Sequence, residues 1–144
     1  MQTFYASPQT VLDACAKTRG TNKQMEHALK IAFAVHESMI FHSKKKSNNS
    51  SSMKPNHITY ATLFKAVYKL IPDAGEERNA IVRILFQHAK RAGQIDRYVL
   101  TNMQLAAEVD LFRELMDPIS DRNGYMHYDK IPQEWCKNVY RQNR

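Results

Sequence analysis

Few side chains of this 144-residue chain have the type and spacing that catalysis or metal binding needs. His36 and His88 both lie on apolar stripes, where a histidine is more often a hydrogen-bonded core residue than a base or a ligand. No cysteine or carboxylate stands at a metal-ligand spacing from either histidine. The sequence also lacks a nucleophile elbow, a phosphate-binding loop and a paired-carboxylate motif. We therefore expect no enzyme, no catalytic residue, no metal site and no cofactor.

The stretch from Asp117 to Gly124 carries carboxylates and a glycine in the manner of a calcium-binding loop. Its register does not fit, because Arg122 follows Asp121 where the loop requires glycine, and the bidentate glutamate at the end of the loop is missing. We therefore expect this stretch to be a turn without a bound cation.

The cysteines and the first residues bear on the compartment. Cys15 and Cys136 are isolated, and Cys15 lies on an apolar helix face where a buried free thiol is expected. The segment from Met1 to Tyr5 lacks the basic and apolar regions of a secretory signal and is not an Arg-rich transit peptide. No apolar run approaches the roughly 20 residues of a membrane helix. We expect an intracellular, reducing compartment and no membrane partner.

The net charge of +7 comes from the first half of the chain. Residues 1–72 contain ten Lys and Arg against three Asp and Glu, whereas residues 73–144 contain eleven of each class. The polar tract at 43–52 includes three consecutive lysines and buries too little apolar surface to offset its ordering entropy, so it predicts a mobile loop. A polyanionic partner fits this distribution, and a solvated loop is the simpler interpretation of the lysine run.

Any site must be positioned by helices, because apolar residues recur at three- and four-residue steps. The clearest helical hairpin begins after a turn at Pro55 and Asn56, with Thr59 as the expected cap. The apolar face of its first helix consists of Tyr60, Leu63, Phe64, Val67 and Ile71. A turn at 72–75 leads to a second helix, whose apolar positions are Ala80, Ile81, Ile84, Leu85, His88 and Ala92. Gly93 is placed to end that helix in the left-handed conformation.

Other segments look like copies of this hairpin. Ser7 and Pro8 are good start signals for a short helix, and an apolar stripe from Met25 to Ile40 predicts its long partner. The segment 10–17 aligns with 62–69, and Val99, Leu100, Met103 and Ala106 mark a third first helix. Repeated antiparallel helix pairs are typical of an α-solenoid.

We therefore predict an all-α fold, an α-solenoid of two to three antiparallel helix-hairpin repeats with an irregular C-terminal tail. Repeat 1 spans 5–56 and includes a polar insertion at about 43–53. Repeat 2 spans 57–96, and a partial repeat 3 spans 97–116. The tail at 117–144 is expected to cap the last helix pair through Trp135, because a terminal repeat otherwise exposes its core face.

The segment Lys54-Pro55-Asn56, followed by Ile58-Thr59-Tyr60, Leu63 and Ala66, resembles a pentatricopeptide repeat. Residues 11–17 are similar to the first helix of that family, and Lys90-Arg91-Ala92-Gly93 with Ile95-Asp96 is similar to its repeat end. The resemblance covers about residues 5–107. It implies binding of single-stranded RNA, with each repeat reading one base through two or three side chains.

Carried over by position, the resemblance assigns roles to individual residues. The base-reading candidates are Gln9, Asn56, Ala61, Asp96 and Thr101. The stacking candidates are His57 and Ile58, and the phosphate-contact candidates are Lys44, Lys45, Lys46 and Lys54. Amide, carboxylate and hydroxyl groups can distinguish donors from acceptors on a base edge. Ala61 departs from the pattern, because a methyl group cannot hydrogen-bond a base.

The resemblance implies a role in RNA processing, stability or translation in a mitochondrion or plastid. Two and a fraction repeats read few bases, so we expect part of a longer array, a partial gene product or a decayed member. A second hypothesis is a protein-interaction module, whose repeat surface docks a peptide or a partner helix without RNA. A third is a remnant with no independent function and a low melting temperature.

Overall fold

The computed structural model describes residues 7–44 and 54–139. These residues form seven α-helices and no strand, so the predicted all-α class is confirmed. The α-helices are α1 (Pro8–Ala16), α2 (Asn22–Ser43), α3 (His57–Leu70), α4 (Glu76–Arg91), α5 (Arg97–Ala106), α6 (Val109–Leu115) and α7 (Gln133–Cys136). Two 3-10 turns, η2 (Asp117–Ile119) and η3 (Tyr128–Lys130), lie in the tail. Within the described ranges, no helix combines the length and the apolar character that crossing a membrane requires.

Polar side chains start four of these helices by accepting a hydrogen bond from a backbone N–H of the first turn, which otherwise has no partner. Ser7 caps α1, as predicted, and Thr21 caps α2. Asn56 caps α3 and Asp96 caps α5. The prediction that Thr59 caps α3 is wrong. The Thr59 hydroxyl instead accepts from the Asn56 N–H at 3.0 Å, while Asn56 Oδ1 accepts from the Thr59 N–H at 3.0 Å, which completes a reciprocal capping box.

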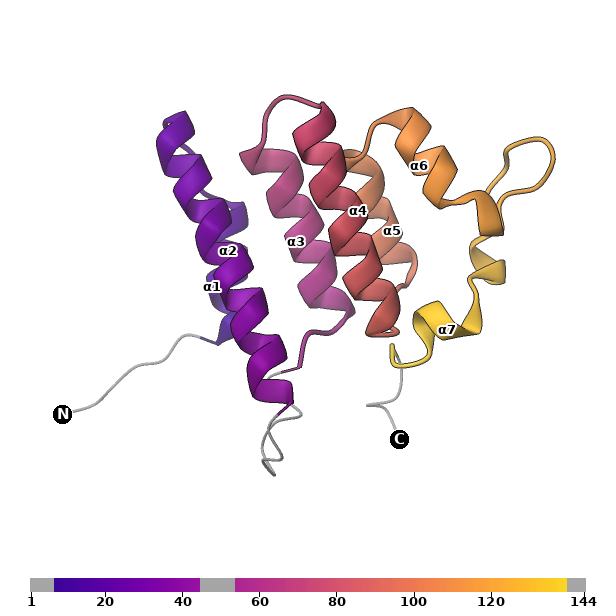
Figure 1. Cartoon of the computed structure of the whole chain (residues 1–144), viewed down its shortest axis with the longest axis horizontal. Helices are drawn as coiled ribbons and strands as arrows, with labels where there is room; N and C mark the ends of the chain where they lie inside the picture. Colours follow the sequence, from indigo (N-terminus) through magenta and orange to yellow (C-terminus); the bar gives the residue numbers. More distant parts are fainter. Residues whose placement is uncertain (1–6, 45–53, 140–144) are drawn as a thin grey trace.

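The central helix is α3, which packs against α1, α2, α4 and α5. Helices α1, α3 and α5 lie side by side, and α2 and α4 lie in front of them in the view of Figure 1. Helices that follow one another in the chain also pack together, α1 with α2, α3 with α4 and α5 with α6. Each of the ranges 5–56, 57–96 and 97–116 therefore contains one contacting helix pair.

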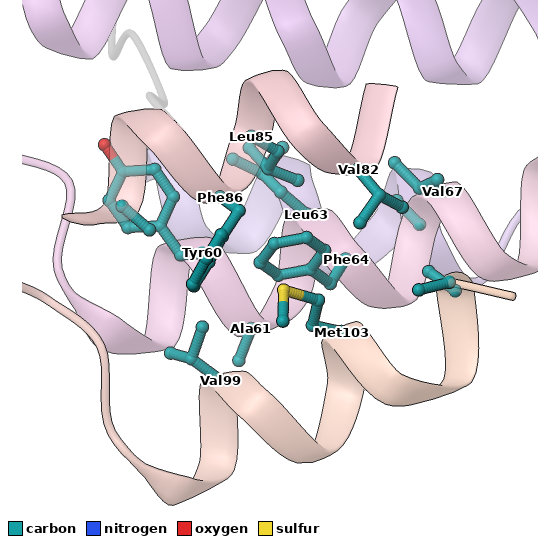
Figure 2. Packing of buried hydrophobic residues seen from close by; sticks show 14 of the residues in the cluster. Tyr60, Ala61, Leu63, Phe64, Val67, Val82, Leu85, Phe86, Val99 and Met103 are labelled. Carbon is teal, nitrogen blue, oxygen red and sulfur yellow. The ribbon is translucent and has the colours of Figure 1, made fainter. Parts of the chain in front are cut away.

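The core is built around the buried stripe of α3. Figure 2 shows the side chains of this stripe packed against those of α4 and α5. The ten labelled residues of this cluster are each at most 4% exposed: Tyr60, Ala61, Leu63, Phe64 and Val67 of α3, Val82, Leu85 and Phe86 of α4, and Val99 and Met103 of α5. Burying one large apolar side chain contributes about 1.5–3 kcal/mol, so this cluster is the main source of stability. Ile84 was expected on the apolar side of α4 but is 60% exposed, because the buried stripe of α4 runs through Val82, Leu85, Phe86 and Ala89.

Gly93 ends α4 as the sequence predicts. Its φ of +67° is left-handed, and the N–H of Gln94 donates to the carbonyl of Ala89 at 3.0 Å. This is the arrangement that lets a helix satisfy its last carbonyls and turn sharply. The turn brings Ile95 into the core, where it has no exposed surface.

The tail follows a different path from the one predicted. Helix α6 has only seven residues, and the chain then turns back so that α7 packs against α4, as Figure 1 shows. The Trp135 ring meets the Phe86 ring edge-on with centroids 5.3 Å apart, and the Trp135 carbonyl accepts from the Ile95 N–H at 2.8 Å. Trp135 thus covers α4 of the preceding helix pair, and not the end of the last pair, because the short α6 leaves the side of α4 open.

Candidate nucleic-acid interface

One side of α1, α3 and α5 is turned away from α2 and α4. Side chains at helical spacing project from this side because residues three, four or seven apart share a helix face. We call this surface the first-helix face. Its exposed or partly exposed members are Asp13 and Lys17 of α1, Ile58, Lys65, Tyr68 and Lys69 of α3, and Tyr98, Thr101 and Leu105 of α5.

The lysines of the first-helix face share it with one carboxylate, that of Asp13, which stands four residues before Lys17 on α1. No ion pair within 7–44 and 54–139 involves Lys17, Lys65 or Lys69. The opposite layer differs, because Lys30 of α2 lies 3.4 Å from Glu26 and Arg83 of α4 forms two hydrogen bonds to the carboxylate of Glu114. The hydrogen bonds from Arg83 hold the pKa of the Glu114 carboxyl below its usual value.

Two exposed tyrosines lie on the same face, Tyr68 near the end of α3 and Tyr98 at the start of α5. Tyr68 is 40% exposed and Tyr98 is 46% exposed, so both residues have surface available for contact. The guanidinium carbon of Arg78 lies 5.6 Å from the centre of the Tyr68 ring, which leaves Tyr98, among the described residues, as the ring without a neighbouring cation. Flat rings beside cations are what single-stranded nucleic acids bind, since bases stack on the rings while phosphates meet the cations. The candidates chosen from the sequence include none of these five residues, Lys17, Lys65, Tyr68, Lys69 and Tyr98. The signal was present, because Lys65 and Lys69 stand four residues apart on the polar side of the α3 stripe.

The predicted reader Gln9 bridges two first helices. Its Nε2 donates to Thr62 Oγ1 at 2.8 Å and to Asp13 Oδ1 at 2.9 Å. Thr62 is buried between α1 and α3, so the bond to Thr62 fixes the side-chain amide at the junction of the two helices. Among the described residues, no hydrogen bond uses the Oε1 atom of Gln9, which leaves that oxygen available as an acceptor.

The predicted readers Asn56 and Asp96 occupy matching positions, because each caps a first helix. Asp96 Oδ1 accepts from the Val99 N–H at 2.9 Å, and Asp96 Oδ2 lies 2.7 Å from His57 Nδ1. The close approach to His57 is an ion pair when the imidazole is protonated, and His57 Nδ1 forms no hydrogen bond with the described residues. The structure thus brings a predicted stacking residue, His57, against a predicted reader, Asp96.

Of the remaining candidates, the reader Ala61 is buried, whereas the reader Thr101 and the stacking residue Ile58 are exposed. Ala61 has no exposed surface, and Figure 2 shows it directed towards α5 beside Val99 and Met103. The reader role expected of Ala61 has no surface to act through, because α3 and α5 approach each other closely at this small residue. Thr101 is exposed on α5, and its hydroxyl donates to the carbonyl of Arg97 at 2.9 Å. Ile58 is 37% exposed at the start of α3.

The predicted phosphate contacts are only partly within the described chain. Lys44 is exposed at the end of α2, and Lys54 is exposed just before α3. Lys45, Lys46 and most of the polar insertion at 43–53 lie outside the described residues. Lys54 and Asn56 lie at the start of α3. Lys17 and Lys69 lie at the other end of the first helices, where α1 and α3 end.

The histidines that could do chemistry lie in the core or in a turn. His36 Nε2 is 3.2 Å from the Tyr60 hydroxyl oxygen, and the His36 and His88 rings meet edge-on at 5.5 Å. Burial, with help from His88, lowers the pKa of His36 to about 4, so the ring is neutral at physiological pH. Within the described ranges, no group of three His, Cys, Asp or Glu side chains could hold a metal ion.

The stretch that resembles a calcium loop forms a tight turn. Asp121 Oδ1 accepts from the N–H groups of Asn123 at 2.8 Å and Tyr125 at 3.1 Å, and Asp121 Oδ2 is 2.9 Å from His127 Nε2. The hydrogen bond from His127 is the main reason that the pKa of the Asp121 carboxyl is lowered. Both oxygens of Asp121 thus take part in the turn itself.

Comparisons of the chain with protein-family models, with curated proteins and with solved structures find no match. The pentatricopeptide resemblance therefore stays a prediction that depends on the motifs of the sequence.

Proposed function

We propose that this chain binds single-stranded RNA, with the first-helix face as the surface that contacts the strand. The observation that carries the proposal is the set of lysines without an ion pair among the described residues, Lys17, Lys65 and Lys69. Tyr68 is exposed next to Lys69 near the end of α3, and Tyr98 is exposed at the start of α5, at the other end of the same face. Phosphate contacts supply most of the affinity for nucleic acids, and base stacking on aromatic rings adds to it without demanding one sequence. The motif resemblance is a second, independent support.

We also propose the finer architecture, an α-solenoid in which each helix pair stacks on the next. In such a stack, each first helix packs on the first helix and on the second helix of the preceding pair. The contacts of α3 with α1 and α2, and of α5 with α3 and α4, are those that this arrangement requires. By resemblance, the role would be RNA processing, stability or translation in a mitochondrion or plastid.

Base reading has a smaller part in the proposal than the resemblance alone implies. The side-chain oxygen of Asn56 and one carboxylate oxygen of Asp96 already accept capping hydrogen bonds, and the amide nitrogen of Gln9 donates to Thr62 and Asp13. Ala61 is left out of the reader set because it is buried. We therefore expect RNA affinity that depends strongly on charge and weakly on sequence.

Binding to a pool of labelled random single-stranded RNA tests the proposal by fluorescence anisotropy at 50 and 200 mM salt. Each phosphate contact contributes about 0.7 to the slope of log affinity against log salt, so three lysine contacts give a slope of about −2. The double variant Lys65→Gln/Lys69→Gln should reduce that slope by about 1.4. The matched control is Lys23→Gln/Lys30→Gln on α2, which removes the same charge from the opposite layer and should keep the slope.

The proposal fails if the RNA pool does not bind at 50 mM salt, or if the two double variants lose RNA affinity equally. A protein partner is then the better candidate, because Ile58 and Leu105 expose apolar surface on the same face, 37% and 49% of each residue. If the face binds a protein, a partner should still be captured after ribonuclease treatment. The Leu105→Glu variant should no longer capture that partner, whereas Lys65→Gln/Lys69→Gln should still capture it.

A further inference from the structure

A hollow of about 580 Å³ lies where the α1–α2 turn meets the α3–α4 turn. Four cationic side chains line it, Lys17, Arg19, Lys69 and Arg78, together with Tyr68. None of its lining residues is Asp or Glu. The volume falls within the roughly 300–1,000 Å³ of small-molecule sites, and the lining favours a ligand with negative charge.

Arg78 is the most informative of these side chains, because it is a buried cation, only 6% exposed. Its Nε donates to the carbonyl of Ala106 at 2.9 Å, and its Nη1 donates to the carbonyl of Ile71 at 2.9 Å. Its guanidinium carbon lies 5.6 Å from the centre of the Tyr68 ring. These partners are polar but carry no full negative charge, and among the described residues no carboxylate forms an ion pair with Arg78.

A buried charge is costly unless an opposite charge or several hydrogen bonds compensate it. The carbonyls of Ile71 and Ala106 compensate part of the charge of Arg78. An anion in the hollow would supply the counter-charge that the described protein residues do not. Lys17, Arg19 and Lys69 form no ion pair within the described ranges either, so their ammonium and guanidinium groups are free to turn towards the same anion.

We propose that this hollow binds the phosphate monoester group of a nucleotide, at the end of an RNA strand or free in solution. A monoester carries close to two negative charges at pH 7, which suits a hollow lined by four cations better than the single charge of a phosphodiester does. Lys17 and Lys69 belong to both the hollow and the first-helix face, so a strand lying on that face can place its end here. The strand-end source rests on the proposed RNA binding, whereas the free-nucleotide source does not.

The test titrates the full chain at 50 mM salt with adenosine 5′-monophosphate, with adenosine, and with one RNA octamer in three forms. The octamer carries a 5′-phosphate, a 3′-phosphate or hydroxyls at both ends. We expect the monophosphate to bind about tenfold tighter than adenosine, and one phosphate-ended octamer to bind about tenfold tighter than the hydroxyl form. Arg19→Gln should abolish both preferences, because Arg19 lies in the hollow but not on the first-helix face.

Arg91→Gln is the matched control, since Arg91 is an exposed arginine at the far end of α4 and should leave both preferences unchanged. The inference would be overturned if the protein preferred neither the monophosphate over adenosine nor a phosphate-ended octamer over the hydroxyl form. Equal losses in Arg19→Gln and Arg91→Gln would overturn it as well. Tight monophosphate binding with no binding of any octamer would keep the inference as a free-nucleotide site and defeat the proposed RNA function. Equal binding of all three octamers, with no preference for the monophosphate over adenosine, would do the reverse.

Discussion

At the scale of single residues, capping competes with base reading for the same atoms. A cap must accept a hydrogen bond from the first turn, and a reader must offer its side chain to a base. One side-chain oxygen of each residue, Asn56 and Asp96, accepts a hydrogen bond from the helix that it caps, and the second oxygen of Asp96 lies 2.7 Å from His57 Nδ1. Only the rest of each side chain is left for a ligand, which is why we assign affinity to the lysines and give the readers a minor part.

His36 should make stability depend on pH. Its folded pKa of about 4 lies below its ordinary 6.5, so the unfolded chain binds more protons between these values and stability falls with falling pH in that window. The contribution is fully present above pH 6.5 and lost as the pH falls towards 4. Between pH 7 and pH 5 we expect wild type to lose about 2 kcal/mol more than the His36→Gln variant, measured by urea unfolding.

His27→Gln is the matched control for this measurement, because His27 is an exposed histidine on the same helix. It should follow the wild-type pH dependence. An unchanged pH slope in His36→Gln would mean that the His36 ring is not held neutral by its packing against Tyr60 and His88.

At the scale of elements, the ends of helices decide how the chain turns. Gly93 has φ +67°, and a Cβ placed there would lie 2.7 Å from Lys137 Cγ and 2.9 Å from Asn138 Nδ2. The same turn receives hydrogen bonds from the tail, because the Asn138 N–H donates to the Gly93 carbonyl at 2.9 Å and Asn138 Nδ2 donates to the Ala92 carbonyl at 2.8 Å. One left-handed glycine therefore both ends α4 and leaves room for the segment after α7.

Gly93→Ala should lower the free energy of unfolding by about 2–3 kcal/mol, because left-handed strain of about 1–2 kcal/mol adds to the displacement of the tail. Urea unfolding measures the loss. Trp135 is the single tryptophan of the chain, so its emission should also shift to longer wavelength as the tail loosens.

Gly75→Ala is the contrasting substitution. The φ of Gly75 is 174°, which any residue adopts, and an added Cβ would meet no atom within 4 Å. We expect a change of less than about 0.5 kcal/mol. If Gly93→Ala lowered the free energy of unfolding as little as Gly75→Ala does, the turn at Gly93 would not need a glycine.

At the scale of the whole molecule, the tail completes the structure around α4. The short α6 ends at Leu115, and α7 packs against α4 further along, so the rings of Trp135 and Phe86 meet edge-on. Phe86 is 1% exposed and belongs to the central core. The Nζ atom of Lys90 lies 4.6 Å from the centre of the Phe86 ring and 5.2 Å from that of Trp135, where a cation interacts favourably with both. The tail and the core thus share side chains.

We therefore expect the tail to unfold together with the helices. The urea midpoint measured by Trp135 fluorescence should coincide with the midpoint measured by far-ultraviolet circular dichroism, as for a two-state domain. The physical reason is that detaching α7 would expose Phe86 to water and leave the backbone N–H of Ile95 without its partner. A fluorescence transition at clearly lower urea would show instead that the tail is a separate unit of low stability.

Local signals in the sequence determined the helices and their ends. Ser7 and Pro8 start α1, Gly93 ends α4, and the spacing of Tyr60 and Phe64 gives α3 its buried stripe, because each signal acts within about one helical turn. Lys65 and Lys69 could also be read from the sequence, because they lie on the polar side of that stripe. The all-α class followed from the same local patterns.

The tertiary structure alone decided which helix each face meets. Ala61 is buried because α5 lies against it, Ile84 is exposed because no described helix covers it, and Trp135 packs on α4 because α6 is short. The contact between His57 and Asp96 likewise joins two caps that are far apart in the chain. Periodicity reports that a face is apolar or polar, but its neighbour depends on the packing of distant segments, which no local pattern contains.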